Sequence, residues 1–187
     1  EQDGIVYNYD MTQIAFVTEG LKEVTIPASI TQLSGFEGNK QLVKVKFEEG
    51  SQIKSIGGFK GCKNLTEIEL TSSIEQIQAS AFSECVNLKN ISIPDGTKLI
   101  GGSAFRGCTG LTSVVIPESV TEMSGSVFSN CSNLQYAEIN AQIMAIDYYM
   151  FEDCKSLLEV KLSDTLKQIG FRAFSGCGQL KNISIPS

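Results

Sequence analysis

The sequence of 187 residues contains no histidine and no tryptophan. Without histidine, the chain cannot form a His-dependent catalytic triad, a histidine general base or the commonest protein metal site. Basic residues are also few, with 15 Lys and Arg against 21 Asp and Glu, which gives a net charge of −6. Because nucleic-acid affinity comes mainly from cations that neutralise phosphates, this balance predicts no nucleic-acid partner.

Long hydrophobic runs and catalytic motifs are also missing. No stretch approaches the roughly 20 apolar residues that cross a bilayer, so we expect no membrane-spanning segment. Gly-x-Ser-x-Gly, Ser-x-x-Lys and phosphate-loop motifs do not occur, and an enzyme without histidine would need a pocket with a perturbed Lys, Asp or Glu. The sequence therefore predicts no enzymatic activity, no catalytic residue and no cofactor.

What the sequence does contain is a repeat with a period of 23 residues. Cysteines recur at this spacing, and so do phenylalanines and leucines. The cysteines are Cys62, Cys85, Cys108, Cys131, Cys154 and Cys177, and the phenylalanines are Phe59, Phe82, Phe105, Phe128, Phe151 and Phe174. With a shorter first unit, the repeat covers about residues 21–187. We predict a single domain of about seven repeats, the first shortened and the last partial.

One unit, residues 111–133, shows the local pattern. The alternating pair Val114 and Ile116 predicts one strand of about three to five residues per repeat, ended by the following proline. In the preceding units, Ser-Ala-Phe-Ser-Glu-Cys over residues 80–85 and its equivalents predict a single helical or 3₁₀ turn. The residue directly before cysteine is Gly, Asn or Asp in five of six units, which predicts a left-handed turn.

Such a unit cannot close a core alone, because its apolar residues point to one side of a single coil. Stacked coils solve this problem. We therefore predict an α/β solenoid with a parallel strand ladder on one face and short helical or irregular turns on the other. Each cysteine then occupies the same interior slot, which favours free buried thiols over a disulfide framework. A zinc site is less favoured, because paired Cys-x-x-Cys motifs do not occur.

Residues 111–133 and 157–179 resemble the 23-residue leucine-rich repeat of BspA-like bacterial cell-surface proteins. Residues 3–17 resemble the hairpin that precedes the repeats in that family. The resemblance implies that the solenoid is a right-handed leucine-rich-repeat superhelix with a β-hairpin cap over residues 1–20. It also implies an extracellular or surface-anchored location, and adhesion or ligand recognition. The implied partner is an extracellular protein or glycan of a host or a microbe.

The outer face of the strand ladder is the candidate binding surface, because curved solenoids bind through such a face. Its side chains alternate with core residues and are not constrained by packing. The candidates are Lys44, Lys46, Glu67, Glu69, Lys89, Tyr136, Glu138 and Lys161. Interspersed charges favour a protein-recognition surface over a phosphate track. The simpler alternative is a solvated sheet with no ligand.

One unit departs from the pattern. It has Ala137 at a core strand position, Asn140 in place of proline, and Asp-Tyr-Tyr-Met over residues 147–150. Tyr148 and Tyr149 join Tyr136 as binding candidates, because exposed tyrosines bring a large contact area at low entropic cost. The alternative is repeat drift, in which Tyr149 or Met150 packs into space left by Ala137.

The sequence ends directly after an expected strand over residues 183–185, without a capping segment. Solenoids need caps to cover apolar side chains and strand edges. This predicts either a piece of a longer array or two copies packed end to end. A rigid spacer that holds another domain away from a surface is the alternative to a binding function.

Overall fold

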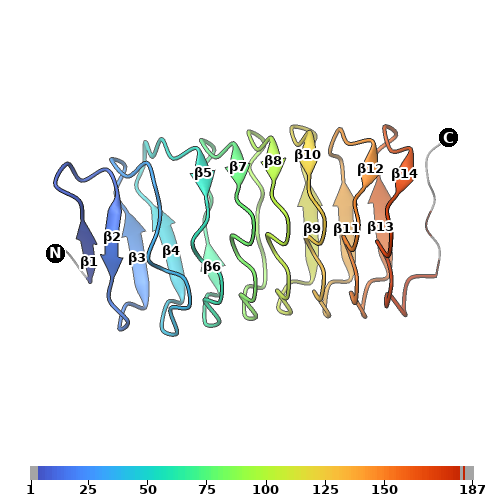
Figure 1. Cartoon of the computed structure of the whole chain (residues 1–187), viewed down its shortest axis with the longest axis horizontal. Coiled ribbons are helices and arrows are strands. Elements are labelled where there is room, and N and C mark those ends of the chain that lie inside the picture. Colours follow the sequence, from blue (N-terminus) through green and yellow to red (C-terminus); the bar gives the residue numbers. More distant parts are fainter. Residues whose placement is uncertain (1–3, 182, 184–187) are drawn as a thin grey trace.

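The computed structural model describes residues 4–181 and residue 183 (Figure 1). Similar coils are stacked in one row between β1 (Ile5–Tyr7) and β14 (Gln168–Ile169). At the N-terminal end, β1 pairs antiparallel with β2 (Ile14–Val17). All other paired strands run parallel. The prediction of a stacked solenoid with parallel strands is therefore confirmed.

The expected strand ladder consists of two parallel three-stranded sheets. The first contains β3 (Glu23–Ile26), β4 (Lys44–Phe47) and β6 (Glu67–Ile68), and the second contains β9 (Ser113–Ile116), β11 (Tyr136–Ile139) and β13 (Glu159–Leu162). Equivalent residues of successive repeats lie side by side, so that Val114 is opposite Ala137 and Ala137 is opposite Val160. These three side chains are buried, whereas their neighbours along each strand face outward.

A second ladder was not predicted. It consists of two-residue strands that lie above the first ladder in Figure 1. β5 (Ser55–Ile56), β7 (Gln76–Ile77), β8 (Leu99–Ile100) and β10 (Glu122–Met123) form one sheet, and β12 (Ala145–Ile146) pairs with β14. The expectation of one strand per repeat was wrong for the coils of β5, β7, β10, β12 and β14, because each of them makes a second short parallel pairing after its turn. The coil of β8 has this short strand but no strand in the first ladder.

The segment around each phenylalanine is not helical. The described residues contain no helix, so the α/β description is not confirmed. In the coil of Phe82, the residues Ser80 and Glu84 have positive φ, which a right-handed helix excludes. The amides of Ser80, Phe82 and Glu84 instead donate to the next coil, at 2.7–2.9 Å. These turns therefore join the coils along a third line of hydrogen bonds.

The left-handed position before each cysteine is confirmed in all six repeats. These residues are Gly61, Glu84, Gly107, Asn130, Asp153 and Gly176, with φ between 56° and 79°. Glu84 adopts this conformation although glutamate does not favour it. A second left-handed column was not expected and contains Ser80, Ser103, Ser126, Tyr149 and Arg172.

The core contains a continuous stack of phenylalanine rings. Neighbouring ring centroids lie 5.1–5.6 Å apart along Phe36, Phe59, Phe82, Phe105, Phe128, Phe151 and Phe174. Each cysteine thiol donates to a phenylalanine carbonyl of the preceding coil, as Cys85 does to Phe59 at 3.1 Å. All six cysteines are free, so the predicted thiol ladder is confirmed. Each thiol links two coils through a hydrogen bond, which is buried for every cysteine except the partly exposed Cys177.

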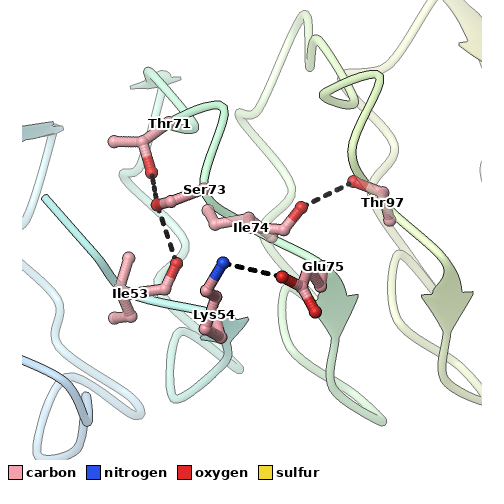
Figure 2. A network of polar contacts seen from close by, with 7 residues as sticks. All are labelled: Ile53, Lys54, Thr71, Ser73, Ile74, Glu75 and Thr97. Carbon is pink, nitrogen blue, oxygen red and sulfur yellow. Dashed lines mark hydrogen bonds and ion pairs between the residues drawn. The ribbon is translucent and has the colours of Figure 1, made fainter.

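Hydroxyl groups link the coils at the turn between the two ladders (Figure 2). Ser73 donates to the carbonyl of Ile53 at 2.9 Å and shares a hydrogen bond of 2.7 Å with Thr71. The buried Thr97 donates to the carbonyl of Ile74 at 3.4 Å. These bonds satisfy carbonyl groups that would otherwise lack a protein partner between the strands.

Burial raises the pKa of Cys62 to about 11, that of Cys131 to about 12 and that of Cys177 to about 11. It also raises the pKa of Cys108. We expect a pulse of iodoacetamide at pH 8 to label the native thiols more than about 100-fold more slowly than the urea-unfolded chain, because the thiolate reacts and burial blocks access. Mass spectrometry of the digest should show Cys177, which is partly exposed, labelled first. Rapid labelling of Cys108 would contradict this packing.

Several apolar side chains of the last described coil are only half-buried. They are Leu162, Ile169, Phe174, Cys177 and Leu180. The strand expected over residues 183–185 falls mostly outside the described residues. End-to-end packing of two copies stays a prediction, as does the division into a cap over residues 1–20 and about seven repeats over residues 21–187.

Candidate functional site

The candidate residues on β4 and β6 are engaged with each other. Lys44 and Glu67 are register partners and form an ion pair. Their hydrogen bond is the main reason why the pKa of Lys44 is raised and that of Glu67 is lowered. Lys46 lies beside Lys44 in a groove of about 380 Å³ near β1, and the backbone amide of Glu69 donates to Val45 at 3.3 Å. This end of the face is polar and partly self-neutralised.

The candidates on β11 and β13 form a different surface. Tyr136, Glu138 and Lys161 line a shallow hollow of about 220 Å³ with Val115 and Glu159. Ser113, Val114 and Ala137 complete its lining. We call these eight residues the tyrosine depression. Val115 and Tyr136 are 52% and 48% exposed, so they give the hollow two large apolar surfaces that are open to solvent.

The register of the sheet explains why these side chains converge. Ser113, Tyr136 and Glu159 form one row across β9, β11 and β13, and Val115, Glu138 and Lys161 form the next outward row. Within the described chain, neither Glu138 nor Lys161 forms an ion pair within 4.0 Å. In contrast to Lys44 and Glu67, they are therefore available to a ligand.

The structure separates Tyr148 and Tyr149 from the tyrosine depression. They follow β12 of the second ladder, and their rings meet edge to face with centroids 5.8 Å apart. Tyr149 makes a second edge-to-face contact of 5.7 Å with Phe171. Met150 is fully buried, so it is a core residue and not part of a binding surface. The three candidate tyrosines therefore do not form one site.

Sequence reasoning missed Phe171 and Arg172, which extend this second aromatic cluster. Phe171 is 69% exposed, and the Arg172 guanidinium lies 5.9 Å from its ring centroid. A signal was present, because Tyr148 and Phe171 occupy the repeat position held by Gly125 in the preceding coil. The Tyr148 ring lies so close to Gly125 that a Cβ there would collide with it.

Lys89 belongs to neither cluster. It lies in residues 88–98, which occupy the place between β6 and β9 in the first ladder but form no strand. In the described part of the chain, no group of three or more Cys, Asp or Glu residues is placed to hold a metal ion. The same residues include no helix with the length and hydrophobicity needed to traverse a lipid bilayer.

The coils of 23 residues, the parallel ladders and the internal rows of Leu, Phe and Cys define a leucine-rich-repeat solenoid. The chain belongs to the family described as the BspA type leucine rich repeat region, which matches residues 10–101 and 75–187 in six copies. The family resemblance seen in the repeat pattern is therefore confirmed. No curated protein matches the sequence.

Solved bacterial structures share the fold. A leucine-rich repeat protein of T. pallidum is 28% identical, with a TM-score of 0.78 over 95% of this chain and 87% of that chain. A leucine-rich cell surface protein of Faecalibacterium prausnitzii is 20% identical, with a TM-score of 0.55 over 97% and 74%. The pneumococcal vaccine antigen PcpA is 22% identical, with a TM-score of 0.55 over 88% and 36%. The last two likenesses show the fold alone.

Proposed function

We propose that this protein is a non-enzymatic recognition module that binds an extracellular partner protein through the tyrosine depression. The observation that carries the proposal is the combination of exposed Val115 and Tyr136 with the unpaired charges of Glu138 and Lys161. Binding energy at protein interfaces concentrates in aromatic residues surrounded by polar groups. The hydrogen-bonded ladder beneath the depression holds these side chains in place before binding, which lowers the entropic cost.

A location outside or on the surface of the cell is part of the proposal. It is supported by the family and by similar structures described as a cell surface protein and as a vaccine antigen. The lack of enzymatic activity is supported by the surface electrostatics. The shifted pKa values of carboxyl groups, as at Asp10 and Glu75, arise mainly from hydrogen bonds with Thr12 and Lys54 at the surface and not from burial of the carboxyl group.

A rigid spacer is the second candidate function. The observation that favours it is the unbroken stack of rings from Phe36 to Phe174. Stacked repeats that contact their neighbours along the whole array form a stiff rod. The two functions differ in their prediction, because a spacer has no affinity on the ladder face.

The test is a binding screen of the purified chain against arrays of extracellular-matrix proteins and glycans, followed by affinity measurements on the hits. We expect a protein hit and at least a tenfold loss of affinity in Tyr136→Ala, since truncation of a central aromatic residue costs more than about 1.4 kcal/mol. Tyr148→Ala is the matched control, because Tyr148 is 51% exposed and Tyr136 is 48% exposed.

The control separates the possible outcomes. Unchanged affinity in Tyr136→Ala would exclude the tyrosine depression as the site. A loss in Tyr148→Ala alone would move recognition to the aromatic cluster after β12. Hits confined to the glycan array would contradict a protein partner, and binding to neither array would support the spacer.

A further inference from the structure

The first ladder is interrupted at one coil in its middle. Residues 89–93 lie between β6 and β9 and have the sequence Lys-Asn-Ile-Ser-Ile, which is typical of a strand. Figure 1 shows a tube there in place of an arrow. In other coils the first residue of this segment bonds to the preceding coil, as Gln135 does to Thr112 at 2.8 Å. Among the described residues, the equivalent amides of Lys89 and Thr112 make no backbone hydrogen bond.

The interruption is confined to the ladder face. On the turn side of the same coils, the rings of Phe82 and Phe105 stack at 5.4 Å, like their neighbours. Ile91 and Ile93 remain buried in the core. The coil is therefore packed in register, but the described residues 89–93 form no backbone hydrogen bond with either adjacent coil. One edge of β9 is consequently left without a paired strand.

A groove of about 340 Å³ runs along this edge. Its walls are residues 90–93 with Asp95 on one side, and residues 113–115 with Pro117 on the other. We call it the open seam. Residues 113–115 also line the tyrosine depression. The open seam and the depression are therefore two sides of the same strand, β9.

We propose that the open seam accepts an extended peptide segment of the partner protein, which pairs with β9 through main-chain hydrogen bonds. The inference rests on the proposed function and gives its mode of recognition. An unpaired strand edge presents alternating N–H and C=O groups, and another extended backbone matches that spacing along its length. Alternate side chains of the bound segment then reach Val115 and Tyr136 in the depression.

The segment 89–93 makes this pairing possible. Among the described residues, no backbone hydrogen bond between this segment and a neighbouring coil has to break when the peptide binds. The buried side chains of Ile91 and Ile93 have to shift within the core. Among the residues that line the seam, Asn90, Ser92 and Ser113 are small or polar, whereas Val115 is apolar and exposed. The polar side chains select no particular residue of the bound segment, so specificity falls to Val115 and Tyr136 in the depression.

The first experiment measures hydrogen exchange of backbone amides by NMR, without and with a synthetic peptide of residues 156–164, which contain β13. In the free protein, we expect the amides of Ser113 and Val115 to exchange at least tenfold faster than those of their register partners Tyr136 and Glu138. The peptide should slow the exchange of Ser113 and Val115. Equal exchange in the free protein would show that the seam is closed and would overturn the proposal.

A disulfide that closes the seam tests the same point. Asn90 and Ser113 are exposed and occupy equivalent positions of adjacent repeats, 23 residues apart, so we would combine Asn90→Cys with Ser113→Cys. Oxidation should lower the affinity for the peptide at least tenfold, as measured by fluorescence anisotropy, and reduction should restore binding. Thr25→Cys with Lys46→Cys is the matched control, because these register partners lie in an already paired sheet. Equal affinity in the closed and open forms would overturn the proposal.

A peptide with N-methyl groups on alternate amides should fail to bind, because it keeps the side chains but loses half of its main-chain donors. Failure of the unmodified peptide to bind, or binding of the methylated form, would also contradict main-chain pairing. Binding of the partner found in the arrays distinguishes this inference from the proposed recognition function. If Tyr136→Ala lowers the affinity for that partner but closure of the seam does not, the recognition function stands and binding through a paired peptide segment is wrong.

Discussion

The substitution Phe105→Ala is expected to lower the free energy of unfolding by roughly 3–5 kcal/mol. The Phe105 ring is fully buried and stacks on Phe82 at 5.4 Å and on Phe128 at 5.6 Å. Alanine removes the ring and both stacking contacts, and the surrounding coils cannot collapse into the space while their turns stay hydrogen-bonded to each other. Urea denaturation followed by circular dichroism measures the change.

The position of Phe105 adds a second expectation. Each coil contacts only its neighbours, so a weakened central interface allows the two halves of the array to unfold separately. We expect a broadened or two-step transition in Phe105→Ala. The matched control is Phe171→Ala, in which an exposed ring is removed, with an expected cost below about 1 kcal/mol. If Phe105→Ala lowered the free energy of unfolding no more than the control, the stacked rings would not be a main source of stability.

The features that the sequence predicted are those repeated in every coil. The cysteine and phenylalanine columns predict the core, because a side chain at a fixed position of each coil meets its equivalents in the adjacent coils. The left-handed turn before cysteine was predictable from glycine, asparagine and aspartate. Glu84 adopts the same left-handed conformation, because hydrogen bonds with the adjacent coil impose it on the backbone.

The features that the sequence did not predict depend on contacts between particular coils. The second ladder consists of two-residue strands, which are too short to show an alternating pattern. The open seam lies in residues whose strand pattern is intact, so that only the positions of the adjacent coils reveal the missing hydrogen bonds.

The candidate binding residues show the same division. Their exposure followed from strand alternation, and the structure confirms an outward position for Tyr136. The sequence could not predict which opposite charges form an ion pair. Lys44 lies opposite Glu67, and Glu138 lies opposite Lys161, so both pairs place opposite charges in register. Only the first of these pairs forms an ion pair among the described residues.

The adjacent glycines Gly101 and Gly102 provide the sharpest test of such local contacts. Gly101→Ala is expected to lower the free energy of unfolding by roughly 1–3 kcal/mol, the usual cost of overpacking. A Cβ on Gly101 would lie 2.5 Å from the amide nitrogen of Ala79 and 2.9 Å from its Cα. These are backbone atoms of the adjacent coil, so no change of side-chain rotamer relieves the collision.

Gly102→Ala is the matched control, because the new Cβ would lie 3.4 Å from its nearest neighbour, the carbonyl oxygen of Gly125. Neither glycine has a positive φ. Alanine at position 102 should leave stability unchanged or raise it by up to about 1 kcal/mol, because it reduces the entropy of the unfolded chain. Thermal and urea denaturation of both variants measure the difference.

The repeat pattern by itself would give the opposite expectation. Gln78 and Ser124 occupy the position of Gly101 in the adjacent coils, so the pattern indicates that a side chain is tolerated there. The structure instead places the position 101 backbone against Ala79, with the Gly101 amide donating to Ile77 at 2.8 Å. Equal stability of the two variants would mean that the coils separate at this point without cost, and the close contact of these coils would then be wrong.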